Sequence, residues 1–292
     1  MTVEKAPDTG FCYGVRRAID MVRQAAREYG SAQTLGPVVH NEPVLKELEA
    51  IGVTVASRPD DLQGDTVVIS SHGLSPEAEA ALRRRHANVI NTTCPFVHRA
   101  QTAARRLARA GFFVVVYGDA DHAEVKGILG WANGRGMATL DAADITNLAK
   151  LPRRLGVVAQ TTQVPERFTG FVNKLVDAAF GRDSEIWAIN TICHDTRQRQ
   201  AATLELAGRV DLMLVIGSRT SANTNHLARL AAGTTETHLI ETAAEIQPAW
   251  LEGRKRIGVT SGASTADQTI AAVLARLEDL ICGPPPLTPP DR

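Results

Sequence analysis

The chain has 292 residues, and its 32 basic and 32 acidic side chains give a formal net charge of +0. This balance gives no electrostatic basis for binding nucleic acid or an anionic membrane. No apolar run approaches the ~20 residues of a membrane span, and the first residues lack the pattern of a secretory signal. We therefore expect a cytoplasmic protein with reduced thiols, long enough for two or three domains.

Short apolar runs alternate along the chain with segments of helical composition. Runs without polar alternation are typical of parallel strands that are buried on both faces. The strands expected on this basis are 67–70, 114–117, 156–159, 212–216 and 257–260, and the clearest helical segments between them are 100–110 and 201–207. This alternation predicts an α/β fold with mostly parallel sheets.

Three cysteines occupy equivalent places in this pattern. Cys12, Cys94 and Cys193 each come just before a stretch of helical period that is rich in Ala and Arg. A long internal repeat of this kind predicts three similar α/β units. Their expected bounds are 1–93, 94–192 and 193–282, followed by a Pro-rich tail, 283–292, that we expect to be disordered. Thiols at equivalent points of three units can converge on one axis.

Each unit also has polar residues where a predicted strand ends. They are His40 and His72 in the first unit, His122, Glu124 and Thr161 in the second, and Ser221, Asn223 and Ser264 in the third. Ligands of α/β proteins bind beyond the carboxyl ends of parallel strands, and helix N-termini favour phosphate. We therefore predict a pocket for a small anion such as a diphosphate. Glu124, two residues from His122, could relay a proton.

The three repeat cysteines favour an iron–sulfur cluster. A disulfide would pair only two of them, and structural zinc usually takes four ligands in closely spaced pairs, whereas no Cys-x-x-Cys is present. A [4Fe-4S] cluster held by Cys12, Cys94 and Cys193 would leave one iron open to substrate. Inert packing remains the alternative for any single cysteine. Cys282, beside the tail, is interpreted as a bystander.

Two nucleotide motifs are missing from the sequence. There is no Gly-x4-Gly-Lys-Ser/Thr phosphate loop, which argues against nucleotide hydrolysis, and no Gly-x-Gly-x-x-Gly fingerprint of a nicotinamide or flavin site. Electrons for any redox step are therefore expected to come from a separate protein.

Ten motifs, in order along nearly the whole chain, resemble the 4-hydroxy-3-methylbut-2-enyl diphosphate reductase (LytB) family. They are Gly10-Phe-Cys12-Tyr-Gly-Val-Arg-Arg, Gly36-Pro-Val-Val-His40-Asn41, Ser71-His72-Gly73, Thr93-Cys94-Pro95, His122-Ala-Glu124, Gln160-Thr161-Thr162, Ile192-Cys193, Arg199-Gln200, Ser221-Ala-Asn223 and Gly258-Val-Thr-Ser-Gly-Ala-Ser264. The resemblance implies a three-lobed, pseudo-threefold α/β trefoil around a central [4Fe-4S] cluster. The three repeat cysteines match its ligands.

The resemblance also implies a reaction and roles for the polar residues. Two electrons from ferredoxin or flavodoxin and two protons would remove the allylic hydroxyl as water, which gives isopentenyl and dimethylallyl diphosphate in the methylerythritol phosphate pathway. Glu124 would supply a proton. Residues matching the family's diphosphate site are His40, His72, Ser221, Asn223 and Ser264, while His122, Thr161 and Glu124 match the group near the hydroxyl.

Several positions depart from the family pattern. Ala222 stands where a serine is common, Ala123 where a proline is, and Asp119 where a histidine is usual; the segment 195–198 also differs. Other functions therefore stay open: a divergent reductase of a related allylic substrate, a cluster-dependent hydratase or dehydratase that uses iron only as a Lewis acid, or a non-catalytic redox or iron sensor.

Overall fold

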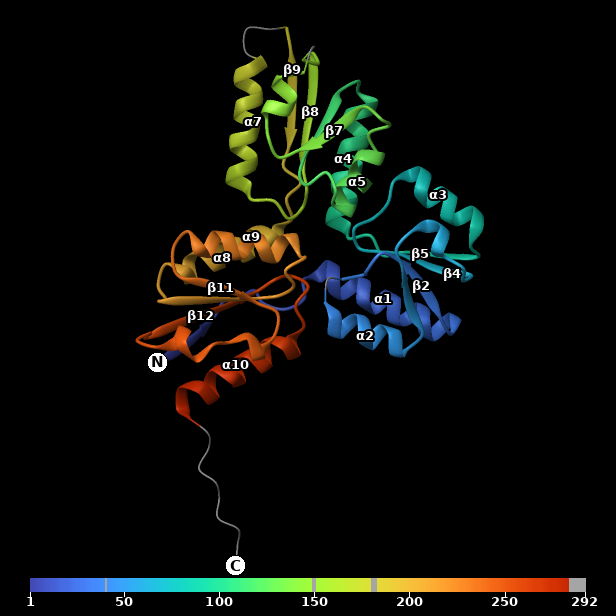
Figure 1. Cartoon of the computed structure of the whole chain (residues 1–292). Coiled ribbons are helices and arrows are strands. Elements are labelled where there is room, and N and C mark those ends of the chain that lie inside the picture. The colour runs from blue at the N-terminus through green and yellow to red at the C-terminus, as the bar shows by residue number, and fades with distance from the viewer. Residues whose placement is uncertain (40, 149–150, 180–182, 284–292) are drawn as a thin grey trace, which may run out of the picture. The chain divides into compact units, whose positions relative to one another are not determined.

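The computed structural model describes residues 1–39, 41–148, 151–179 and 183–283. These residues contain three sheets, each of four parallel strands, with helices between successive strands (Figure 1). Contacts divide the chain into two compact units, Cys12–Arg197 and Met1–Phe11 with Gln198–Arg292. The first of these units holds two sheets and the second holds one.

The first sheet of the Cys12–Arg197 unit has the strand order β3-β2-β4-β5. Its elements are α1 (Tyr13–Tyr29), β2 (Ala32–Leu35), α2 (Glu42–Ala50), β3 (Val53–Ala56), the 3-10 turn η1 (Pro59–Asp61), β4 (Thr66–Ile69), α3 (Pro76–Arg85) and β5 (Asn88–Asn91). All four residues of β4 are buried. Helix α1 buries Ala18, Ile19 and Val22 at helical spacing, so one face packs on the sheet.

The second sheet of this unit has the order β7-β6-β8-β9. Its elements are α4 (Pro95–Arg109), β6 (Phe113–Tyr117), α5 (Ala123–Gly130), β7 (Gly136–Thr139), α6 (Ala143–Thr146), β8 (Arg154–Ala159), α7 (Pro165–Ala179) and β9 (Glu185–Ile189). Alternate residues of β6 enter different cores: Val114 packs with Leu107 of α4, and Val115 packs with Phe171 of α7. Burial on both faces explains why the strand lacks polar alternation.

The third sheet, with the order β1-β12-β10-β11, lies in the other unit. Its elements are β1 (Thr2–Lys5), β10 (Leu212–Ile216), α9 (Ala222–Ala232), β11 (Thr237–Ile240), the 3-10 turns η2 (Ala243–Glu245) and η3 (Pro248–Leu251), β12 (Arg256–Ser261) and α10 (Asp267–Cys282). Helix α8 (His194–Ala207) begins in the Cys12–Arg197 unit and continues into this one. The sequence places residues 1–11 in the first predicted unit, but β1 instead pairs with β12, with Thr2 opposite Arg256.

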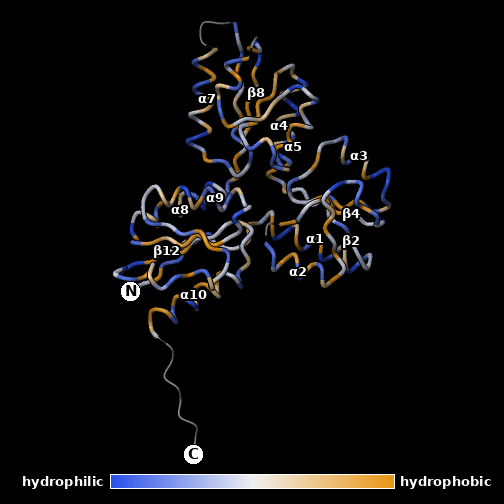
Figure 2. Tube along the Cα trace, viewed as in Figure 1, coloured by the Kyte–Doolittle hydropathy of each residue, from blue (hydrophilic) through white to orange (hydrophobic). Residues whose placement is uncertain are grey.

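The α/β class with parallel sheets is confirmed. The five predicted strands coincide with β4, β6, β8, β10 and β12, and the predicted helical segments lie in α4 and α8. Figure 2 shows hydrophobic residues along the central strands and hydrophilic residues on outer turns of the helices. The predicted tail, 283–292, lies outside the described residues apart from Gly283. Within the described ranges, no helix has both the length and the apolar character that a bilayer crossing needs.

Candidate active site

The three repeat cysteines all stand at the start of a helix. Cys12 is the N-cap of α1, Cys94 is the N-cap of α4, and Cys193 directly precedes α8. The carbonyl oxygen of each accepts the backbone N–H four positions further on, at 2.9 to 3.1 Å. The free N–H groups and positive dipole end of a helix stabilise a thiolate at this position.

The surroundings of Cys94 and Cys193 favour the neutral thiol over the thiolate. Burial raises the pKa of Cys94 and of Cys193, and backbone N–H groups of the following helical turn act in the opposite direction. The charge of Glu124 also raises both pKa values, and Cys193 raises that of Cys94. A metal centre would invert this balance, because it stabilises thiolate directly.

A glycine leaves room for two of the thiols. A Cβ atom on residue 14, in the first turn of α1, would lie 2.5 Å from Sγ of Cys94 and 3.9 Å from Sγ of Cys12. Sulfur atoms from two different repeats therefore approach the same point. We did not single out Gly14 from the sequence, although a glycine near the start of a good helical pattern is a signal that close packing is needed there.

Glu124 is held at the carboxyl end of the second sheet. Its carboxylate accepts the backbone N–H of Thr161 at 2.7 Å and the Thr161 hydroxyl at 2.9 Å. The side chain of Glu124 is buried, and burial raises its pKa to about 7, against the lowering effect of the two Thr161 bonds. A carboxyl group with this pKa can both hold and release a proton near neutral pH.

The two described histidines of the predicted site lie next to each other. His122 is the N-cap of α5 and accepts the backbone N–H of Glu124 at Nδ1, at 3.2 Å. The rings of His72 and His122 meet edge to face with centroids 5.4 Å apart. His72 Nδ1 also lies 3.3 Å from the Ser70 hydroxyl. The predicted residue His40 lies outside the described residues.

Backbone hydrogen bonds connect the cysteines to these polar strand ends. The N–H of Cys94 donates to the carbonyl oxygen of Ser71, the neighbour of His72, at 3.0 Å. The N–H of Cys193 donates to the carbonyl oxygen of Thr161, also at 3.0 Å. Two repeats thus place a cysteine beside a polar strand end in the same way. The Cys12–Arg197 unit brings together the three cysteines, His72, His122, Glu124 and Thr161.

The other unit holds Ser221, Asn223 and Ser264. Ser221 is the N-cap of α9 and accepts the N–H of Thr224, while Ser264 lies in the turn between β12 and α10. Asn223 is 5% exposed, and neither polar atom of its amide has a hydrogen-bond partner among the described residues. The buried Thr224 hydroxyl also lacks one. Buried groups of this kind need an external partner, so they are suited to a polar ligand. Nothing in the sequence distinguishes Thr224.

The residues present fit a [4Fe-4S] cluster. All four cysteines are free, and the three of the repeat come from helix starts within one unit. In the described part of the chain no three His, Cys, Asp or Glu side chains are arranged to hold a single metal ion. A cluster separates its thiolate ligands by more than one ion does, and cysteine thiolates are its usual donors; three of them would leave one iron without a protein ligand. Cys282, at the end of α10, is exposed.

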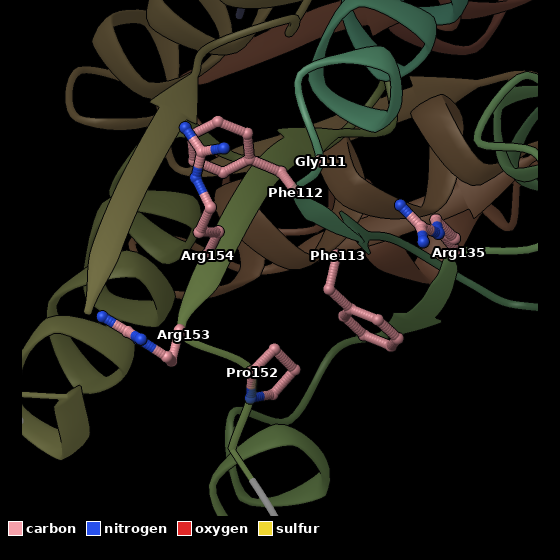
Figure 3. Close-up of a pocket in the computed structure, with 7 residues that line it drawn as sticks. All are labelled: Gly111, Phe112, Phe113, Arg135, Pro152, Arg153 and Arg154. Atoms are coloured by element: carbon pink, nitrogen blue, oxygen red, sulfur yellow. The ribbon is translucent and has the colours of Figure 1, made fainter. Parts of the chain in front are cut away.

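The pocket in Figure 3 is separate from these residues. It measures about 360 Å³ and lies at the amino ends of β6 and β8, lined by Gly111, Phe112, Phe113, Arg135, Pro152, Arg153 and Arg154. Arg153 pairs with Asp183, Arg154 pairs with Glu185 at 2.8 Å, and the Arg154 guanidinium covers the Phe112 ring. Carboxylates thus already offset two of its three positive charges. Ligands of parallel sheets bind at the opposite strand ends.

The fold and the Cys12–Arg197 site define an α/β enzyme that combines clustered thiols with a buried acid. A family model described as LytB protein matches residues 3–278. The chain is 53% identical over 283 residues to the 4-hydroxy-3-methylbut-2-enyl diphosphate reductase of Dehalococcoides mccartyi, with coverage of 97% of this chain and 100% of that protein. A protein of the same name from Aquifex aeolicus is 40% identical, with 95% and 96% covered. The chain therefore belongs to the LytB family and is a reductase.

Two solved structures share the fold. One is (E)-4-hydroxy-3-methyl-but-2-enyl diphosphate reductase, described as the terminal enzyme of the non-mevalonate pathway; it is 39% identical with a TM-score of 0.70 and covers 96% of this chain and 100% of its own. The other, E-1-hydroxy-2-methyl-but-2-enyl-4-diphosphate reductase from Plasmodium falciparum, is 25% identical with a TM-score of 0.88, covering 97% and 88%. The family resemblance and the α/β class are both confirmed.

Proposed function

We propose that the chain reduces 4-hydroxy-3-methylbut-2-enyl diphosphate. The C–O bond would break and the hydroxyl would leave as water with one proton, while two electrons and a second proton would form a C–H bond at one end of the allyl system, giving isopentenyl or dimethylallyl diphosphate for isoprenoid synthesis. The observation that carries this proposal is the buried Glu124, whose carboxylate accepts the N–H and the hydroxyl of Thr161, while the carbonyl oxygen of Thr161 accepts the N–H of Cys193. The names of the relatives from D. mccartyi and A. aeolicus support the substrate.

We further propose that Cys12, Cys94 and Cys193 hold a [4Fe-4S] cluster. Such a cluster, when bound, supplies electrons and an open Lewis-acid iron, neither of which side chains can provide. The helix starts supply N–H groups that stabilise the three thiolates. Gly14 leaves the space that the sulfur atoms need.

Glu124 is the proposed proton donor. Burial keeps part of this carboxyl protonated at neutral pH, so Oε1 or Oε2 can give a proton to the departing hydroxyl. The carboxylate that remains keeps the N–H and hydroxyl of Thr161 as donors at 2.7 and 2.9 Å. These two bonds stabilise the charged product of proton transfer. His122, the N-cap of the same helix, fixes the backbone at Glu124.

Diphosphate binding is assigned to neutral donors rather than to lysine or arginine. In the Gln198–Arg292 unit, Asn223 has a buried amide that needs a partner, and Ser221 and Ser264 carry hydroxyl groups. His40 and His72 stay predicted contacts. Anchoring the diphosphate would hold the hydroxyl end in a fixed orientation, which lowers the entropic cost of reaction. Ferredoxin or flavodoxin is the proposed electron donor.

An anaerobic assay tests these proposals. Purified protein should be brown, contain about four irons per chain and oxidise a dithionite-reduced viologen dye only when hydroxymethylbutenyl diphosphate is added. Both isoprenyl diphosphates should appear in the products, and Cys12→Ser should remove the activity. Water exchange without dye oxidation would instead identify a hydratase. A loaded chain that is inert to allylic alcohols would contradict an enzymatic role.

A further inference from the structure

An arginine from the first cysteine-bearing helix binds the backbone that leads to the second cysteine. Nη1 of Arg17 donates to the carbonyl oxygen of Thr92 at 3.4 Å and to that of Thr93 at 3.3 Å. Arg17 is on α1, five residues after Cys12, and Thr93 directly precedes Cys94. The turn that precedes Cys94 is therefore hydrogen-bonded to the helix that begins after Cys12.

The same relation recurs at the next repeat. Nη2 of Arg99, five residues after Cys94, donates to the carbonyl oxygen of Asn190 at 2.7 Å, and Asn190 lies three residues before Cys193. Both contacts fall within the Cys12–Arg197 unit. A guanidinium presents several N–H groups in a fixed plane, so it can hold carbonyl groups of an irregular turn that have no strand partner.

A third contact of this type lies within the other unit. Nη1 of Arg199, six residues after Cys193, donates to the carbonyl oxygen of Asp8 at 2.9 Å. Asp8 lies four residues before Cys12, and Arg199 is only 3% exposed. The arginine that follows each cysteine thus binds the segment that precedes the next cysteine in the order first, second, third, first. Arginines that merely kept a helix surface hydrated would not be expected to bind the turn before the next cysteine in all three repeats.

We propose that Arg17, Arg99 and Arg199 are positioning residues that fix the spacing of the three cysteine thiols. They act through the backbone turns before the cysteines, whose carbonyl oxygens accept their N–H groups. This inference rests on the proposed cluster, because a cluster accepts ligands only at a narrow range of spacings.

The test compares substitutions within each helix. Arg17→Gln and Arg99→Gln remove the guanidinium, and Arg17→Lys and Arg99→Lys keep the charge and one donor group. Arg27→Gln on α1 and Arg106→Gln on α4 are matched controls. Both residues are exposed and lie further along the same helices, and their substitution by Gln removes the same positive charge. The first measurement is the anaerobic rate of iron transfer from the loaded chain to a chelator.

We expect iron release about tenfold faster in the two Gln variants, as for loss of one hydrogen bond from a charged donor. The Lys variants should fall between these and the parent chain, and the controls should match the parent. Equal release rates in the Gln variants and their controls would overturn the proposal.

A second measurement uses the cluster-free chain. A bifunctional thiol reagent that fluoresces only after both ends react should bridge Cys12 and Cys94 several-fold more slowly in Arg17→Gln than in Arg27→Gln, at equal rates of single alkylation. A chain that never loads iron would refute the proposed cluster, and the bridging rate would still decide the inference. Equal bridging rates would overturn it, and if Arg17→Gln fails to fold, Arg17→Lys gives the same comparison.

Discussion

At the scale of single residues, the site depends on groups that are costly to bury. Glu124 has a pKa well above the usual range of a carboxyl group, and the amide of Asn223 is buried without a described partner. Protein interiors rarely retain such groups without a functional reason. For each of these two residues we therefore predict different effects of substitution on the stability of the fold and on substrate turnover or binding.

Glu124→Gln should keep the cluster and abolish turnover. Glutamine fills the same space but cannot give a proton, so iron content and colour should stay at the level of the parent chain. In the parent, kcat should fall as pH rises through about 7, because the acid form of Glu124 is lost. Anaerobic kinetics across this range check the profile. Turnover by the Gln variant at the parent rate would remove Glu124 from the mechanism.

The same pKa predicts how stability depends on pH. A carboxyl whose pKa is raised in the folded state stabilises the fold below its ordinary value of 4.5 and loses that contribution as pH rises through about 7. The loss is at most about 3 kcal/mol, from the size of the shift. Glu124→Gln should lack this slope, so urea unfolding of the cluster-free parent and variant should diverge between these pH values.

Asn223→Leu should stabilise the fold and weaken diphosphate binding. Replacing two unsatisfied polar atoms by apolar ones of similar size removes a desolvation cost of about 1–3 kcal/mol. Asn225 is a matched control two positions away, because its Nδ2 donates to the carbonyl oxygens of Arg219 and Ser221. Asn225→Leu should therefore destabilise the chain. Urea unfolding and the KM for substrate test both; a destabilised Asn223→Leu would contradict the assignment.

At the scale of elements, helix starts and strand ends determine where chemistry can occur. The strands were predictable because β4, β6, β8, β10 and β12 are buried on both faces and carry no polar alternation. The positions of the three repeat cysteines at helix starts were predictable because each cysteine directly precedes a stretch of helical period. Strand β1 was not predictable: Thr2–Lys5 has no apolar run, and its partner β12 is about 250 residues away.

Some residues of the candidate site could not be predicted from the sequence, because their roles depend on contacts between segments that are distant along the chain. Gly14 matters because Sγ of Cys94 lies beside it, and Arg17 because it meets Thr93; both contacts join residues about 80 positions apart. Periodicity places such residues on a helix but says nothing of their partners. Thr224 differs from an ordinary buried threonine in that its hydroxyl has no hydrogen-bond partner among the described residues, which is a property of its three-dimensional surroundings.

Gly14→Ala should reduce cluster loading. An added methyl at 2.5 Å from Sγ of Cys94 overpacks the turn and should weaken loading by about tenfold. Gly170 in α7 is the control, because a Cβ there would meet no atom within 4 Å. Gly170→Ala should load normally and stabilise its helix by up to about 1 kcal/mol. Iron content after reconstitution tests the pair, and normal loading of Gly14→Ala would exclude thiol crowding at this turn.

At the scale of the whole molecule, each of the two compact units carries its own group of proposed functional residues. All three repeat cysteines belong to Cys12–Arg197, together with Glu124 and Thr161, whereas Ser221, Asn223 and Ser264 belong to the unit that contains β10 and β12. A ligand stabilises the part of a chain that binds it, by an amount that rises with the logarithm of the ligand concentration divided by its Kd. The cluster should therefore stabilise the Cys12–Arg197 unit, and the diphosphate should stabilise the unit that contains α9.

Hydrogen exchange of the loaded and cluster-free chains can detect these effects. Loading should slow exchange in the first turns of α1 and α4 and in the backbone around Cys193, because the cluster restrains the turns that carry its ligands. Exchange in β10 and β12 should change little. Inorganic diphosphate, added to the loaded chain, should instead slow exchange in the first turn of α9, where Asn223 lies. Protection of α9 by the cluster alone, or of none of these turns by diphosphate, would contradict this division of roles.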